Sequence, residues 1–182
     1  WNTSGTPDIS DNKTEEGAAS ASGAFTSNIT SLSPNTLYYV KAYATNTLGT
    51  SYGGEVSFTT TDLPEMDLKQ ASTAIADGGS FDFGSQATDT DTDVAFTIEN
   101  NGGQPLSLSG TPVISITGTN ADQFSVQQQP ASPLSASVNT TFIIRFSPTS
   151  CGDKTASISI ANNDSDENPY DLTITGLVPL QT

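Results

Sequence analysis

Apolar and polar residues alternate along most of the chain, most regularly in its second half. A period of two places successive side chains on opposite faces of an extended segment, so it predicts half-buried strands. Turn-forming residues separate these segments, and no long stretch combines a 3.6-residue period with helix caps. The pattern predicts an all-β protein with no substantial helix, whose second half has six strands, at Val94/Phe96/Ile98, Leu106/Leu108, Ile114/Ile116, Phe142/Ile144/Phe146, Ile158/Ile160 and Leu172/Ile174.

The first half shows the same period over shorter segments. A strand is expected to begin at Val56 and Phe58, after a turn at residues 52–54. Before that turn, the alternation predicts one continuous strand, with one face made of Tyr38, Val40, Ala42 and Ala44 and the other of Tyr39, Lys41 and Tyr43.

The pattern changes at residues 59–64, where an alternating strand gives way to a Thr-rich, Pro-containing segment. Such a segment predicts a domain boundary. We therefore expect a first domain at residues 1–61, a linker at 62–65 and a second domain at 66–182. The acidic charge falls mainly on the second part, because residues 62–182 carry 15 acidic and 3 basic side chains and residues 1–61 carry 5 and 2.

Composition supports the β assignment and excludes several functions. The 182 residues include 24 Ser and 27 Thr, and Thr favours strands while Ser favours turns. The chain has no His and a single Cys, which excludes His-dependent catalytic triads, Cys/His nucleophile pairs and His-type or multi-Cys zinc sites. A net charge of −15 disfavours binding to nucleic acid or to an anionic membrane surface. No apolar run approaches the roughly 20 residues of a membrane span, so membrane insertion is not expected.

The segment LSPNTLYYVKAYATN, residues 32–46, closely resembles the E–F corner and F strand of a fibronectin type III domain. The following residues 48–60 resemble its F–G turn and G strand in the variant common in large secreted bacterial proteins. By this resemblance Tyr38 is the tyrosine-corner residue, with its ring in the core and its hydroxyl bonded to nearby backbone. Residues 1–7 resemble the end of strand C, so the resemblance implies a sandwich that lacks its N-terminal strands.

Such a sandwich has an open strand edge and an uncovered apolar face. We expect a strand from a neighbouring segment or subunit to complete it, with contacts at Trp1, Tyr38 and Val40. The expected partners are copies of this chain or adjacent domains of a longer one.

The second half resembles the choice-of-anchor D family, an immunoglobulin-like sandwich related to the HYDIN and major-sperm-protein group. In the order of that family, the segments that carry the resemblance are FDFGS at 81–85, FTIENNG at 96–102 with Pro105 and Leu106, DQFSV at 122–126, FSPT at 146–149 with Gly152, and NDSDENPY at 163–170. The resemblance spans about residues 66–177. It implies a repeated, non-catalytic module of secreted or surface proteins and no specific ligand.

Three acidic residues that alternate with Thr, at Asp89, Asp91 and Asp93, are candidate ligands for calcium, which prefers oxygen donors. The alternative is an acidic, solvent-facing loop, because alternation along a strand sends all three to one face. A second oxygen-rich loop contains Asp164, Asp166 and Glu167. There the choice-of-anchor resemblance favours a turn in which Asx side chains bind their own backbone.

Other candidate sites have simpler structural explanations. Trp1, Tyr39, Tyr43 and Tyr52 could form an aromatic platform for sugars, but with a single Trp in the chain cross-strand packing is the favoured explanation. Cys151 in a turn is most simply a free thiol, with an intermolecular disulfide as the alternative. A carboxylate pair at glycosidase spacing is possible among 20 acidic residues, although both halves resemble accessory sandwiches.

The sequence predicts a non-catalytic structural module of a secreted bacterial surface protein, composed of two tandem β-sandwiches. We expect a repeat unit or protomer of an extracellular filament, stalk or adhesin, which requires no cofactor and for which calcium is an optional stabiliser. The alternative is a carbohydrate- or cell-surface-binding accessory module of a large secreted enzyme.

Overall fold

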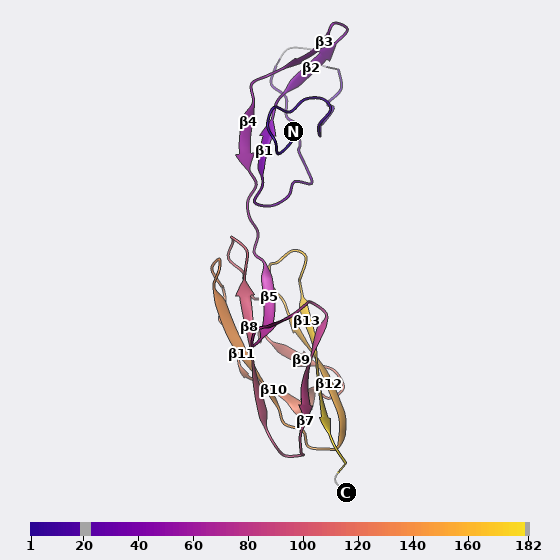
Figure 1. Ribbon diagram of the computed structural model, residues 1–182, viewed down its shortest axis with the longest axis vertical. Helices are drawn as coiled ribbons and strands as arrows, with labels where there is room; N and C mark the ends of the chain where they lie inside the picture. Colours follow the sequence, from indigo (N-terminus) through magenta and orange to yellow (C-terminus); the bar gives the residue numbers. More distant parts are fainter. Residues whose placement is uncertain (19–22, 181–182) are drawn as a thin grey trace. The chain divides into compact units, whose positions relative to one another are not determined.

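The computed structural model describes residues 1–18 and 23–180, and the chain forms two compact units, Trp1–Asp62 and Leu63–Thr182 (Figure 1). The predicted all-β class is confirmed. Within the described residues the helical structure consists of one 3₁₀ turn, η1 (Ala121–Gln123). None of these residues belongs to a helix with the length and hydropathy needed to cross a membrane.

Unit 1 contains two separate antiparallel pairs. β1 (Leu37–Val40) pairs with β4 (Val56–Thr59), and β2 (Tyr43–Asn46) pairs with β3 (Gly49–Tyr52). The prediction of one continuous strand through Ala44 is therefore wrong. Two residues, 41–42, separate β1 from β2, whereas three, 53–55, separate β3 from β4. This mismatch interrupts the ladder as a β-bulge does.

Unit 2 is a sandwich of two sheets. The five-stranded sheet has the order β10 (Phe124–Gln128), β11 (Asn139–Phe146), β8 (Thr92–Asn100), β5 (Met66–Gln70) and β6 (Thr73–Ile75). The four-stranded sheet has the order β7 (Gly79–Ser85), β13 (Tyr170–Val178), β12 (Gly152–Ile160) and β9 (Ser115–Thr117). All pairs are antiparallel except β7 and β13, which are parallel.

The core of unit 2 lies between these sheets and is formed by the inward-facing half of each alternating segment. In β11 the residues Phe142, Ile144 and Phe146 are fully buried, while the residues between them reach solvent to varying degrees. Phenylalanine rings from both sheets are in contact: Phe81 of β7 meets Phe96 of β8 with centroids 5.1 Å apart. Alternation therefore identifies the core correctly, because each sheet buries one face.

For one segment of unit 2 the prediction of buried side chains is confirmed, but the prediction of a regular strand is wrong. Leu106 and Leu108 are both buried, yet within the described residues this segment pairs only through two isolated bridges, from Leu106 to Leu134 and from Ser109 to Ala161. The backbone of Leu108 is bound by a side chain instead, because its N–H donates to Ser132 Oγ and its carbonyl accepts from the same hydroxyl.

Candidate functional site

Two of the three predicted calcium ligands of the 89–93 segment, Asp91 and Asp93, lie beside a basic side chain. Arg145 of β11 stands opposite Asp93 of β8 and donates to both of its carboxylate oxygens, at 2.7 and 2.9 Å. Its Nη1 is also 2.9 Å from Asp91. The guanidinium hydrogen bond holds the pKa of Asp93 below its usual range. Arg145 thus occupies the position where a cation would be needed, and calcium at Asp89, Asp91 and Asp93 stays a prediction.

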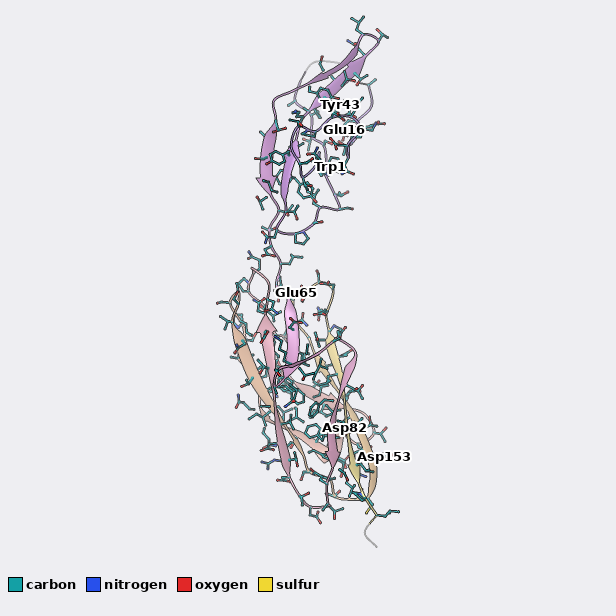
Figure 2. All side chains as sticks on the ribbon, in the orientation of Figure 1. Trp1, Glu16, Tyr43, Glu65, Asp82 and Asp153 are labelled. Carbon is teal, nitrogen blue, oxygen red and sulfur yellow. The ribbon has the colours of Figure 1, made fainter. Side chains whose placement is uncertain are left out.

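A different set of carboxylates converges at one end of unit 2. Oxygen atoms of Glu65, Asp164 and Glu167 lie within 4.8 Å of one another, and this is the one such acidic group among the described residues. Glu65 directly precedes β5 (Figure 2). The other two belong to the loop between β12 and β13. We call these three residues the carboxylate cluster.

Asn162 organises the loop that carries two members of the cluster. Its Oδ1 accepts a hydrogen bond from the Asp164 N–H at 2.7 Å. Its Nδ2 donates to the carbonyls of Ile160 and Glu167, at 3.1 and 2.9 Å. The Asx turn that the sequence suggested here is therefore present, since an amide two residues earlier binds the backbone of Asp164.

Asp164 connects this loop to the start of β5. Its side chain is only 2% exposed, and its Oδ2 accepts from the Met66 N–H at 2.8 Å. This bond joins residues 98 apart in the chain. It fixes the backbone next to Glu65 and brings that carboxylate to the loop.

The backbone of Glu65 is held on its other side by the turn that follows β8. The Asn101 N–H donates to the Glu65 carbonyl at 2.8 Å, and the Glu65 N–H donates to Asn100 Oδ1 at 3.3 Å. A Cβ on Gly102 would lie 2.6 Å from the Glu65 nitrogen and 2.1 Å from the Leu63 oxygen, closer than side chains approach. Glycine at 102 is therefore required for this close backbone approach.

The cluster has an unfavourable electrostatic environment for carboxylates. Burial, followed by the charges of Asp164 and Glu65, raises the pKa of Glu167 to about 7. Desolvation, followed by the charge of Asp164, raises the pKa of Glu65, and burial is also the main cause of the raised pKa of Asp164. Carboxylates that are desolvated together hold protons or bind a cation, because either removes the mutual repulsion.

Sequence reasoning found part of this cluster. It identified Asp164 and Glu167 with Asp166, which is exposed, and it assigned Glu65 to the linker. The sequence feature that relates to the position of Glu65 is the ENNGG turn at residues 99–103, which binds the Glu65 backbone. Its sequence gives no indication of which segment it contacts.

In unit 1 the residues predicted to contact a partner strand surround Tyr38. The Tyr38 ring is 8% exposed and stacks on Phe58, and its hydroxyl accepts from the Ser33 N–H at 3.1 Å. The expected hydrogen bond of a tyrosine corner is therefore confirmed. Val40 and Trp1 are half-buried, and the Trp1 amino group donates to the Asn12 carbonyl.

The aromatic residues considered for sugar binding are tied to backbone. The Tyr43 hydroxyl donates to the Thr14 carbonyl at 3.0 Å, and the Tyr52 hydroxyl accepts from the Ile9 N–H at 3.1 Å. Both hydroxyls therefore fasten loops of unit 1. Cys151 is an exposed free thiol.

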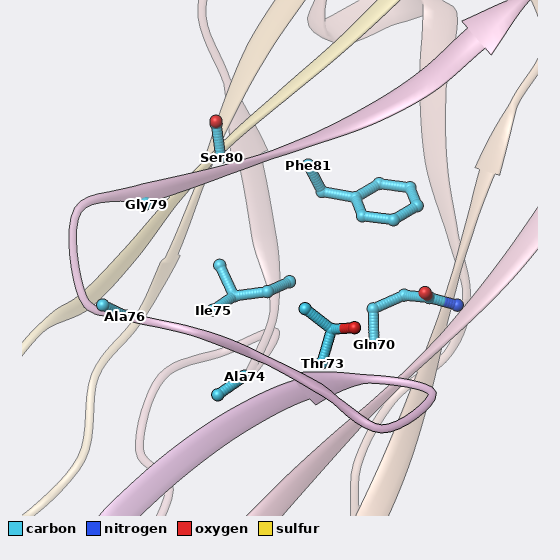
Figure 3. Close-up of a pocket in the computed structure, with 8 residues that line it drawn as sticks. All are labelled: Gln70, Thr73, Ala74, Ile75, Ala76, Gly79, Ser80 and Phe81. Atoms are coloured by element: carbon cyan, nitrogen blue, oxygen red, sulfur yellow. The ribbon is translucent and has the colours of Figure 1, made fainter.

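A pocket of about 400 Å³ lies between β6 and β7 of unit 2 (Figure 3). The apolar side chains of Ile75 and Phe81 contribute to its lining, and Gln70, Thr73 and Ser80 are the polar residues along it. No carboxylate, lysine or thiol is among the residues that line it. Thr73 and Ser80 are the hydroxyl residues among them, and a hydroxyl needs an adjacent general base to act as a nucleophile.

No family model matches the chain, and no curated protein sequence matches it. Its fold is similar to the PapD-like domain 7 of human CEP192, at 12% identity and a TM-score of 0.45, over 66% of this chain and 89% of that domain. It is also similar to WR4, a C. elegans MSP family member, at 9% identity and a TM-score of 0.35, over 55% of this chain and 92% of that one.

A similar chain of another kind is the Vibrio cholerae VesB protease, at 11% identity and a TM-score of 0.41, over 65% of this chain and 32% of that one. These likenesses concern the arrangement of strands alone. The chain is an all-β protein whose second unit is a sandwich of a five-stranded and a four-stranded sheet.

Proposed function

We propose that the chain is a non-catalytic structural module of an extracellular bacterial surface assembly, in which a strand from a neighbouring segment or subunit completes unit 1. The observation that carries this proposal is the outer edge of β4. In the described part of unit 1, β4 pairs with β1 alone.

Hydrogen bonds of β1 show which backbone groups point to that edge. Tyr39 exchanges hydrogen bonds with Asn2 at 2.9 and 3.2 Å, so its N–H and carbonyl point away from β4. Its opposite residue, Ser57, is therefore in a non-hydrogen-bonded position of the β1–β4 pair. The N–H and carbonyl of Ser57 point outward, as do those of Thr59 two residues later. These groups form the donor and acceptor pattern that a further strand would pair with.

The same pair has an apolar face that is open to solvent. Tyr38 stands opposite Phe58, and Val40 stands opposite Val56, so all four side chains share one face. Phe58 is 38% exposed and Val56 is 63% exposed. A donor strand with apolar residues at every second position would extend the sheet and cover this face. We therefore expect an extended apolar segment as the partner.

The test uses the 182-residue protein, whose single tryptophan, Trp1, reports on unit 1. Light scattering over a range of concentrations measures association, and Trp1 fluorescence measures unfolding of unit 1. We expect either concentration-dependent assembly or a monomer in which unit 1 unfolds without cooperativity. A monomer with cooperative unfolding of unit 1 would overturn the proposal.

If the protein assembles, a proline at Ser57 tests whether the edge of β4 is responsible. Ser57→Pro removes the outward N–H without removing a bond to β1, and proline is tolerated on edge strands. We expect it to abolish assembly. The matched control, Ser57→Thr, keeps the N–H and should assemble as the unchanged protein does; assembly that survives the proline would place the interface elsewhere.

A further inference from the structure

We propose that the carboxylate cluster of Glu65, Asp164 and Glu167 is a calcium site that fastens the loop between β12 and β13 to the segment preceding β5. The three residues offer carboxylate oxygens within 4.8 Å of one another, from segments about 100 positions apart in the chain. Hard cations such as calcium prefer oxygen ligands, and calcium accepts irregular sets of six to eight of them.

A second observation is independent of the acidity of the cluster. Oε2 of Glu167 is buried and has no hydrogen-bond partner, the one such side-chain atom among the described residues. Buried carboxylate oxygens are ordinarily paired, because burying an unpaired charged group is strongly unfavourable. The carboxylate group that carries this buried, unpartnered oxygen has an oxygen within 4.8 Å of two further carboxylates, and carboxylates gathered in this way are the ligand type that a hard cation binds.

The protein supplies no positive charge to this cluster. The chain has five basic side chains, and each has a partner elsewhere. Lys13, Lys41 and Lys69 pair with Glu15, Glu55 and Glu99. Arg145 pairs with Asp91 and Asp93, and Lys154 donates to the Cys151 carbonyl. The neutralising charge must therefore come from bound protons or from a cation in solution.

Calcium fits the cluster better than magnesium does. Magnesium requires near-ideal octahedral geometry and keeps several of its waters, whereas calcium takes carboxylates and carbonyls in flexible arrangements. The cluster combines Asp164, which is buried and bound by the Met66 N–H, with Glu65, which is exposed and has a longer side chain. Such a set can close around a large cation and leaves room for water ligands.

The experiment is a calorimetric titration of the 182-residue protein with CaCl₂, together with its melting temperature in chelator and in calcium. We expect one calcium per chain and a rise in the Tm of unit 2 of about 5–10 °C at a hundredfold excess over Kd. Glu167→Gln removes one ligand charge and should weaken binding at least about tenfold. Glu65→Gln changes an exposed side chain, does not threaten folding, and should weaken binding in the same direction.

The matched control is Asp89→Asn, which makes a similar change at the other candidate loop. It should bind calcium as the unchanged protein does. Three outcomes would overturn the proposal: no calcium binding at about 10 mM, which is about tenfold above the roughly 1 mM Kd of the weakest extracellular sites; binding that both glutamine variants retain, which indicates an adventitious ion only; and binding that Asp89→Asn removes. An equal Tm rise in MgCl₂ would overturn the choice of calcium.

Discussion

Apolar and polar residues alternate in both units, but the fraction of the apolar side chains that is buried differs greatly between the units. In unit 2, five strands face four across a continuous core, and Phe96, Phe142 and Phe146 have no exposed surface. In the described part of unit 1, each sheet has two strands, and Tyr38 and Pro7 are the buried residues. A strand pattern is thus sufficient to form strands, whereas burial requires a second layer of side chains.

This difference has an energetic consequence. Burying apolar surface contributes roughly 25 cal/mol for each Å² removed from water, so it is the main source of stability in unit 2. Unit 1 relies more on hydrogen bonds that close its loops, such as those of Tyr43 and Tyr52. Such bonds contribute only about 1 kcal/mol each. Unit 2 is therefore expected to stabilise itself, and unit 1 to depend on what covers it.

The largest expected effect comes from removing the same side chain in each unit. Phe96→Ala leaves a cavity between Phe81 and Phe142 and should destabilise unit 2 by about 3–5 kcal/mol. Phe58→Ala removes a ring that is already partly exposed and should destabilise unit 1 by about 1.5 kcal/mol. Denaturant unfolding measures both, with far-UV circular dichroism for unit 2 and, for unit 1, Trp1 fluorescence of the assembled protein, in which unit 1 is expected to unfold cooperatively.

Equal losses of stability from Phe96→Ala and Phe58→Ala would contradict the difference in burial between the two units. They would mean that unit 1 has a packed core in solution which its burial does not indicate. In that case the uncovered face of β1 and β4 would no longer support completion by a partner strand.

A methyl group added to a glycine gives a smaller contrast. A Cβ on Gly176 in β13 would lie 2.4 Å from the ring of Phe146, so Gly176→Ala should destabilise unit 2 by about 1–3 kcal/mol. A Cβ on Gly54 in unit 1 would have no neighbour within 4 Å, and Gly54→Ala should change stability by less than about 0.5 kcal/mol. Thermal unfolding of both variants measures the difference. A tolerated Gly176→Ala would show that unit 2 repacks as easily as unit 1.

The contrast also explains which parts of the fold the sequence predicts. Alternation located β8, β11, β12 and β13, because each of these strands buries one face in a sandwich. Alternation gave a wrong prediction where the pairing with a neighbouring strand determines where a strand ends. The predicted strand through Tyr38 and Ala44 is divided by the unequal lengths of residues 41–42 and 53–55, which only the pairing reveals.

The carboxylate cluster shows the same division. Asp164 and Glu167 stand out in the sequence because they lie in one acidic loop. Glu65 could not be assigned to them, since the hydrogen bond that brings it to the loop, from the Met66 N–H to Asp164, joins residues 98 positions apart. Long-range contacts of this kind leave no period or spacing from which they could be inferred.

The smallest expected effect concerns the ion pair of Asp93 and Arg145 on the surface of unit 2. Because the folded pKa of Asp93 is lowered, its contribution to stability is present above its unfolded pKa of about 3.9 and is lost as the pH falls through the lower folded value. Asp93→Asn should therefore be less stable than the unchanged protein at pH 7, and this difference in stability should disappear in acid.

Asp122→Asn is the control, because Asp122 takes part in none of the ion pairs among the described residues. Thermal unfolding between pH 2 and 7 gives the stability of both variants. If the stability difference between the unchanged protein and Asp93→Asn grew as the pH falls, it would contradict a stabilising ion pair of Asp93 and Arg145. Unit 1, monitored through Trp1, should be unaffected by either substitution.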